Sequence, residues 1–263
     1  MVSVKVDWLG ITVKGGWDGM NSVLNHWRPW KEWDLGREGL VCDDDWHGRG
    51  MMTYKRSEAF GNGGIVRLYS PDRDDSHLMV RGAGCEWCLR EGLDVMDLAQ
   101  PKPGVTVKRL DFAFDGWTYL GKAISPFRVY LDLLSGKKSI RCPAEKSKFT
   151  FFATGVPMVS STLYVGKRIS DRMVRMYDAR GFCRVELELK GKVAADVWAQ
   201  VGGYGGIYSG KGPAGLLGAY MTILQGESPV GWWSAGLQGC QWAGLAPEDS
   251  DKMIQKPLDG IPF

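Results

Sequence analysis

The stretch Arg109-Leu110-Asp111-Phe112-Ala113-Phe114-Asp115 alternates polar and apolar side chains and predicts a β-strand with one buried face. A second stretch, Arg184-Val185-Glu186-Leu187-Glu188-Leu189-Lys190, alternates in the same way. In a third, Arg172-Met173-Val174-Arg175-Met176-Tyr177-Asp178, Arg175 and Tyr177 share the polar side. We expect these three strands to be neighbours in one antiparallel sheet, with acids, arginines and one phenol gathered on a single face.

Strands and helices are mixed along the rest of the chain and joined by glycine-rich turns, a pattern that predicts an α+β fold. We expect an antiparallel sheet with flanking helices in a first domain, residues 1–191, and a helical, glycine-rich C-terminal region, residues 192–263, which could pack on that domain. The expected strands are 2–14, 51–56, 64–69, 77–82, 105–115, 148–153, 161–167, 172–178 and 183–190. The expected helices are 18–30, 85–98, 126–135, 193–201 and 213–225, and residues 31–50 are expected to form a loop or insertion.

The composition is that of a soluble globular protein. Of the 263 residues 44% are hydrophobic and 24% charged, which excludes a disordered tail protein and a fibre. No stretch approaches the ~18 apolar residues of a membrane helix and the N-terminus lacks a signal-peptide pattern, so we expect a cytoplasmic protein with no membrane partner. The net charge of +3 permits nucleic-acid binding without arguing for it. We interpret Cys85 and Cys88, a lone Cys-x-x-Cys pair, as reduced thiols.

Carboxylates and cations on one sheet face suit a divalent metal ion and a phosphate group. The same pattern is also typical of an exposed sheet face with mixed charges. A sheet that carries aromatic residues such as Tyr54, Tyr69 and Trp117 could instead bind single-stranded nucleic acid by stacking, as an RRM-like module does, without cutting it. The residue patterns alone leave these alternatives open.

Several blocks of the sequence carry a resemblance to a known family. The most specific is Thr162-Leu163-Tyr164-Val165-Gly166-Lys167-Arg168-Ile169-Ser170 running on to Arg175-Met176-Tyr177-Asp178, which resembles the motif T-L-Y-x-G-x-R-x-S…R-x-Y. The strand at 109–115, the R-x-E strand at 184–189, the block at 77–85 and the opening strand at 6–9 resemble four further motifs. The family is that of the rolling-circle replication initiators of small plasmids and filamentous phages, also called the replication initiation factor or Rep trans family.

The resemblance implies a fold similar to HUH endonucleases and a tyrosine that nicks one strand of supercoiled or single-stranded origin DNA. Such an enzyme remains linked to the 5′ phosphate, leaves a 3′-OH that primes synthesis, and later rejoins the displaced strand. The resemblance also implies a divalent metal ion, Mg²⁺ or Mn²⁺, a bacterial host cell, and a host helicase and polymerase as partners. The oligomeric state is left open.

The matching blocks also imply roles for particular residues. Tyr177 is the expected nucleophile and Arg175 its catalytic neighbour, and we expect the arginines nearby to favour the phenolate by their charge. The expected metal ligands are Asp111, Asp115 and Glu186, which we expect to be exposed on the sheet face.

Other residues are candidates for contacts around this site. The basic residues expected to contact DNA phosphates are Lys167, Arg168, Arg172 and Arg109. Glu188 and His77 are weaker candidates for metal ligands, and Tyr164 is a rival nucleophile that we interpret as a packing residue because its stretch is mainly apolar. A further alternative is a carboxylate-dependent metallonuclease that activates water in place of a tyrosine.

Overall fold

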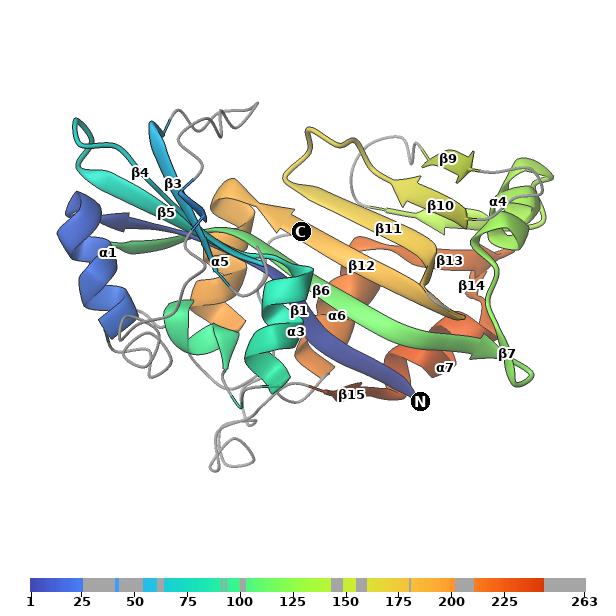
Figure 1. Cartoon of the computed structure of the whole chain (residues 1–263). Helices are drawn as coiled ribbons and strands as arrows, with labels where there is room; N and C mark the ends of the chain where they lie inside the picture. The colour runs from blue at the N-terminus through green and yellow to red at the C-terminus, as the bar shows by residue number, and fades with distance from the viewer. Residues whose placement is uncertain are drawn as a thin grey trace.

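The computed structural model describes residues 1–25, 41–42, 54–60, 64–90, 92, 94–99, 103–142, 149–154, 160–179, 181–201 and 211–243. A long twisted sheet crosses the molecule, and α5, α6 and α7 lie behind it in the view of Figure 1. The helices are α1 (Gly16–Asn25), α3 (Gly82–Arg90), α4 (Pro126–Leu134), α5 (Gly191–Val201), α6 (Lys211–Tyr220) and α7 (Gly231–Gln238), with the 3₁₀ helix η1 (Val95–Ala99). None of the helices in the described residues is long and apolar enough to cross a membrane.

The main sheet has the strand order β2-β3-β4-β5-β1-β6-β12-β11-β10-β9, and every neighbouring pair along this order is antiparallel. The strands in chain order are β1 (Val2–Lys14), β2 (Val41–Cys42), β3 (Arg56–Phe60), β4 (Ile65–Tyr69), β5 (Asp75–Val80), β6 (Val105–Tyr119), β9 (Phe149–Thr154), β10 (Ser160–Val165), β11 (Arg172–Ala179) and β12 (Phe182–Lys190). The short β7 (Lys122–Ala123) extends β6 as a hairpin, and β15 (Cys240–Trp242) pairs in parallel with β1. A small second sheet consists of β8 (Ser139–Arg141), β13 (Thr222–Gln225) and β14 (Ser228–Pro229).

The period-two pattern of β6 separates a hydrophobic face of the sheet from a polar one. Leu110, Phe112 and Phe114 point to the hydrophobic face, and none of them has measurable exposure to solvent. Across β12 these residues lie opposite Leu189, Leu187 and Val185, which are also buried, so one continuous apolar surface is covered by the helices. Burial of this surface is the main source of stability of the sheet.

The other face of β6, β12 and β11, called here the polar face, carries the alternating charged residues. Asp111 lies opposite Glu188, and Asp115 lies opposite Arg184. On the next strand Tyr177 lies opposite Arg184 as well. Directly opposed residues in an antiparallel sheet point to the same side, so the expected adjacency and common face of the three strands are confirmed.

Several expected elements differ from the structure. The strand expected at 51–56 lies instead at Arg56–Phe60, and residues 51–53 are outside the described part. The helix expected at 85–98 is divided into α3 and η1, with Gly92 at a φ of 74° between them, a conformation that ends a helix. The helix expected at 18–30 begins at Gly16, and the structure describes it as far as Asn25. Residues 31–50 are expected to form a loop, and the structure describes only the two-residue strand β2 in this range.

A further difference lies in the C-terminal region, which is not only helical. The helix expected at 213–225 ends at Tyr220, because Thr222–Gln225 form β13 and pair with β8. The described residues after 191 share one core with the sheet: the ring of Trp233 in α7 stacks on Trp117 of β6 at a centroid distance of 4.7 Å.

Candidate active site

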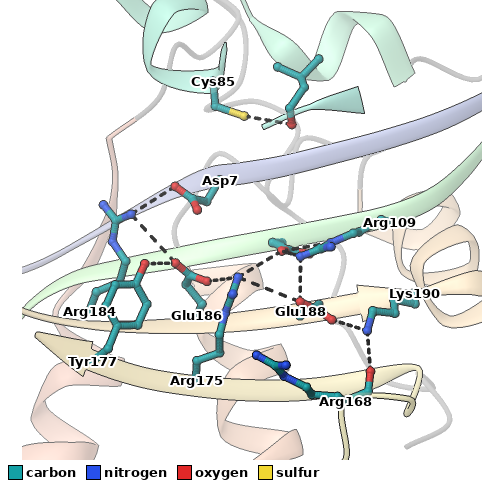
Figure 2. Close-up of polar contacts among 12 residues, drawn as sticks. Asp7, Cys85, Arg109, Arg168, Arg175, Tyr177, Arg184, Glu186, Glu188 and Lys190 are labelled. Carbon is teal, nitrogen blue, oxygen red and sulfur yellow. Dashed lines mark hydrogen bonds and ion pairs between the residues drawn. The ribbon is translucent and has the colours of Figure 1, made fainter. Parts of the chain in front are cut away.

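The hydroxyl of Tyr177 donates a hydrogen bond to Oε1 of Glu186 across the β11–β12 pair (Figure 2). Tyr177 is half-buried, whereas Glu186 is only 1% exposed. Buried carboxylates need polar partners, and Glu186 has a second one because its Oε2 contacts Nη2 of Arg175. The phenol is therefore held against a carboxylate that can accept its proton.

The electrostatic environment of Tyr177 is opposite to the one expected from the sequence. Burial, with the negative charge of Glu186, raises the pKa of Tyr177 above its usual value of 10.0, and Arg184 opposes this only in part. The charge of Arg184 favours the phenolate as expected, but burial and Glu186 outweigh it, so the neutral phenol predominates in the resting site. A reaction with Tyr177 as the nucleophile would therefore include its deprotonation.

Glu186 has the properties of a proton acceptor. Burial raises the pKa of Glu186 above its usual value of 4.5, and the nearby charge of Arg175 acts in the opposite direction. A carboxylate with a raised pKa holds a transferred proton better than an exposed one does. The geometry and the pKa direction together suit Glu186 as a general base for Tyr177.

Arg184 lies beside Tyr177 and Glu186 (Figure 2) and binds two aspartates. Its Nε and Nη2 donate to the two carboxylate oxygens of Asp115 at 2.5 and 2.7 Å, and its Nη1 donates to Oδ1 of Asp7 at 3.2 Å. This paired geometry holds the guanidinium rigidly beside Tyr177. Asp115, an expected metal ligand, is thus engaged by an arginine.

A second arginine–carboxylate group lies farther along β6 and β12. Nη2 of Arg109 is 2.6 Å from Oδ2 of Asp111 and 2.7 Å from Oε2 of Glu188. Lys190 contacts the other oxygen of Glu188. Asp111 has no exposed surface, and its burial raises its pKa to about 7 although Arg109 opposes the shift. The expected exposure of the carboxylates is wrong for Asp111 and Glu186, which are buried, as is Glu188.

The arrangement of these carboxylates does not fit a divalent metal ion. Nη2 of Arg175 lies 3.7 Å from Asp111 and 4.0 Å from Glu188, and it also contacts Glu186. A guanidinium thus occupies the space in which the three carboxylates could meet around a cation. Within the described ranges, no group of three or more His, Cys, Asp or Glu side chains is placed to hold a metal ion.

The expected DNA-contacting residues fall in different places. Lys167 and Arg168 are exposed in the turn between β10 and β11, where the backbone oxygen of Arg168 accepts a hydrogen bond from Lys190. Arg172 lies opposite Leu189 and therefore on the hydrophobic face, away from Tyr177. Arg109 is at the polar face, but its guanidinium is bound to carboxylates and stacks over the ring of Trp8 at 4.0 Å.

His77 and Tyr164 also differ from their expected roles. His77 is 2% exposed and its Nδ1 is 3.1 Å from Oγ1 of Thr12, and burial lowers its pKa to about 4. Its burial and its contact with Thr12 favour a structural role. Tyr164 lies opposite Arg175, which places it on the polar face and not on the packed side, so its interpretation as a packing residue is wrong.

The aromatic residues proposed for stacking are not available for it. Trp117 is 1% exposed and Tyr54 is 8% exposed, so neither can stack on a base. The ring of Tyr69 packs against Trp17 at 4.4 Å. Cys85 and Cys88 are buried free thiols with raised pKa values, consistent with reduced, unreactive cysteines.

Sequence reasoning assigned no role to Arg184, Asp7 or Lys190. The alternation of β12 placed Arg184 and Lys190 on the polar face, and this pattern alone could have identified them as candidate site residues. Alternation in β1 likewise placed Asp7 on the side of Ser3 and Lys5, whereas the register shift between Val6 and Trp8 brings Trp8 to this face as well. Such a bulge changes the direction of a side chain without a sequence signature.

One solved structure resembles the chain along most of its length. It is described as the structure of a rolling circle replication initiator protein from Geobacillus stearothermophilus, with a TM-score of 0.65 and 21% sequence identity. The similarity covers 90% of this chain and 96% of that one. No protein-family model and no curated protein matches the sequence. At this identity the likeness establishes a common fold, in agreement with the expected α+β architecture.

Proposed function

We propose that the chain is a rolling-circle replication initiator that nicks and rejoins one strand of origin DNA through Tyr177. The observation that carries the proposal is the hydrogen bond from the Tyr177 hydroxyl to the buried carboxylate of Glu186. The common fold with a rolling circle replication initiator supports the same class of reaction.

In the proposed reaction, Oη of Tyr177 attacks the phosphorus of a phosphodiester while Glu186 takes the phenolic proton. The bond between phosphorus and the 3′ oxygen breaks, and a 5′-phosphotyrosyl link forms. The 3′ oxygen receives a proton equivalent to the one lost by the phenol, so no energy source is consumed and the reverse reaction rejoins the strand. The free 3′-OH is then available as a primer.

Arg175 and Arg184 are the groups we propose for binding the scissile phosphate. Both guanidinium groups lie beside Glu186, with nitrogen atoms within 4.0 Å of its carboxylate. Fixed cations near a reacting phosphate stabilise the charge that develops in the transition state. A requirement for Mg²⁺ or Mn²⁺ stays a prediction from the family resemblance, and no step of this reaction is assigned to a metal ion.

The proposed partners follow from this reaction. Origin DNA, supercoiled or single-stranded, is the proposed substrate, and we propose that Lys167 and Arg168, both exposed, contact its backbone. A host helicase would unwind the duplex and a host polymerase would extend the 3′ end. The proposed place of action is the cytoplasm of a bacterium.

The test is to incubate the protein with supercoiled DNA that carries its own coding region, in Mg²⁺, in Mn²⁺ and in EDTA. We expect relaxed circles with protein covalently attached to a 5′ end. Tyr177→Phe should abolish cleavage and the adduct together, because the substitution removes the attacking oxygen. Tyr119→Phe, which removes the hydroxyl of an exposed tyrosine outside the polar face, is the matched control and should retain both.

The alternatives give different products in the same assay. A non-catalytic binding module would leave the DNA supercoiled, and a metallonuclease would cut it without an adduct. If Tyr177→Phe still yields a protein-linked 5′ end, Tyr177 is not the nucleophile and Tyr164 becomes the next residue to test.

A further inference from the structure

We propose that Phe152 and Tyr164 form a platform on which an unpaired base of the DNA strand stacks while a neighbouring phosphate lies at Tyr177. The inference rests on the proposed function and specifies the form of its substrate, a single strand. Its basis is the position of one exposed aromatic residue on the edge strand β9 and the cation beside its neighbour Tyr164.

Strand β9 directs its aromatic residues to two different sides. Phe149 and Phe151 point toward α4, where the ring of Tyr130 lies 6.0 and 4.5 Å from theirs. Phe152 points the other way and is 56% exposed, although alternation would allow any polar residue at this position. Phe152 therefore contributes little to the core and leaves much of its ring open to solvent.

The register places Phe152 in line with the proposed nucleophile. Phe152 lies opposite Thr162 of β10, and Thr162 lies opposite Tyr177 of β11. All three residues thus share the polar face in one row across the sheet. Two strand spacings separate Phe152 from Tyr177, about 10 Å between backbones, a distance within the reach of a nucleotide next to the scissile phosphate.

Tyr164 adds a second aromatic ring to this surface and lies next to a cation. Its ring meets that of Phe152 edge-to-face at a centroid distance of 5.6 Å. The guanidinium carbon of Arg168 lies 5.4 Å from the ring centroid of Tyr164, and Arg168 and Lys167 are both exposed. Aromatic rings next to exposed cations bind a base by stacking and its phosphate by charge.

The occupant we assign is single-stranded DNA, because only an unpaired base offers its flat face to a protein ring. In a duplex those faces are stacked on each other, and the grooves offer only base edges. The exposed cations at the platform, Lys167 and Arg168, favour a polyanion over a peptide of neutral or positive charge.

The test measures binding of a fluorescein-labelled oligothymidylate of about 20 nucleotides and of a duplex of the same length. We expect Phe152→Ala to weaken binding of the single strand about 10-fold and to leave duplex binding unchanged, since loss of one stacked base has an effect of this size. Phe152→Trp keeps an aromatic ring at this position and should bind the single strand as tightly as the wild type does. Tyr119→Ala removes an aromatic side chain with the same exposure, 56%, far from this row, and should not change the affinity.

Salt dependence separates stacking from charge. Phe152→Ala should leave the slope of log K against log salt unchanged, whereas Arg168→Ala should reduce it by about 1. The proposal is overturned if the wild type does not bind the single strand, if Phe152→Ala binds it as tightly as the wild type, or if the variant loses duplex binding equally. The covalent adduct assay reports on the proposed function independently, because it scores the link to Tyr177 whatever the affinity for oligothymidylate.

Discussion

As the proposed nucleophile, Tyr177 requires a proton acceptor because its raised pKa disfavours the reactive phenolate. Burial and the charge of Glu186 raise the pKa of the phenol above 10.0, so the neutral form predominates at physiological pH. The same Glu186 accepts the hydrogen bond from the hydroxyl. One carboxylate therefore keeps the resting phenol protonated and is, in the proposed reaction, the group that removes its proton.

Glu186→Gln is expected to slow adduct formation about 100-fold or more, because general-base catalysis contributes roughly 10²–10⁴-fold. The wild-type rate should fall as pH decreases and Glu186 gains a proton. Since burial raises the pKa of Glu186 above 4.5, the midpoint of this fall should lie above pH 4.5. Single-turnover rates against pH measure both effects, and the acid limb should be absent in the variant.

The control is Glu227→Gln, a substitution of the same kind at an exposed glutamate, which should keep the wild-type rate and pH profile. Thermal unfolding monitors the fold of both variants. An unchanged rate and acid limb in Glu186→Gln would exclude this residue as the base.

At the scale of the elements, β6, β12 and β11 carry carboxylates and cations side by side on the polar face, and this set of ion pairs is called here the ladder. Carboxylates lie at the sheet surface, and arginines and lysines cover them; the side chain of Arg175, for example, is 27% exposed and that of Glu186 is 2%. Buried carboxylates without such partners would be strongly destabilising. The ladder therefore holds the proposed catalytic groups in place and presents positive charge outward.

Removal of Arg175 is expected to create a site for a divalent cation. Arg175→Met retains side-chain volume but leaves three carboxylates, Asp111, Glu186 and Glu188, without the guanidinium between them. Carboxylate oxygens that lie close together bind Mn²⁺, so we expect the variant to bind Mn²⁺ at least about 10-fold more tightly than the wild type does. Free Mn²⁺ measured by electron paramagnetic resonance gives both affinities.

Arg128→Met is the matched control, because the side chain of Arg128 is 71% exposed on α4 and lies outside the ladder. Tight Mn²⁺ binding by the wild type, with no gain in Arg175→Met, would contradict the ladder interpretation. That result would support the metal site expected from the sequence.

At the scale of the whole molecule, the C-terminal elements are part of the fold that supports the site. Tyr220 of α6 donates to the backbone oxygen of Arg172 at 2.9 Å, at the start of the strand that carries Tyr177. The rings of Trp232 and Trp233 pack on Trp117 at the end of β6. Residues far along the chain thus hold the strands on which the site is built.

Gly236→Ala is expected to destabilise the protein by about 1–3 kcal/mol, the usual cost of overpacking a core. A Cβ at this position would lie 2.2 Å from Cζ3 of Trp117, so the ring or α7 must move. Urea unfolding measures the free energy of unfolding. Gly231→Ala in the same helix, with nothing within 4 Å of its Cβ, is the control; equal stability of the two variants would refute the packing of α7 on β6.

Much of the architecture was predictable from local pattern. Period-two alternation in 109–115, 172–178 and 183–190 identified three strands, the residues of each face and their common sheet, because alternation is a property of the strand itself. The boundaries of α3 and the existence of β13 and β15 were missed. Those elements depend on a turn glycine or on pairing with a distant strand, neither of which local periodicity reports.

The sequence by itself determined which side chains lie on one face of the sheet. Only the tertiary structure decided how deeply they are buried, which groups they pair with and which charge state they adopt. Polar residues on one face suggested exposed ligands, yet Asp111 and Glu186 are buried and paired with arginines. The sign of the pKa shift of Tyr177 was likewise not predictable. Charge states depend on burial and on neighbours within a few ångströms, and contacts such as that of Asp7 with Arg184, 177 residues apart, exist only once the sheet has formed.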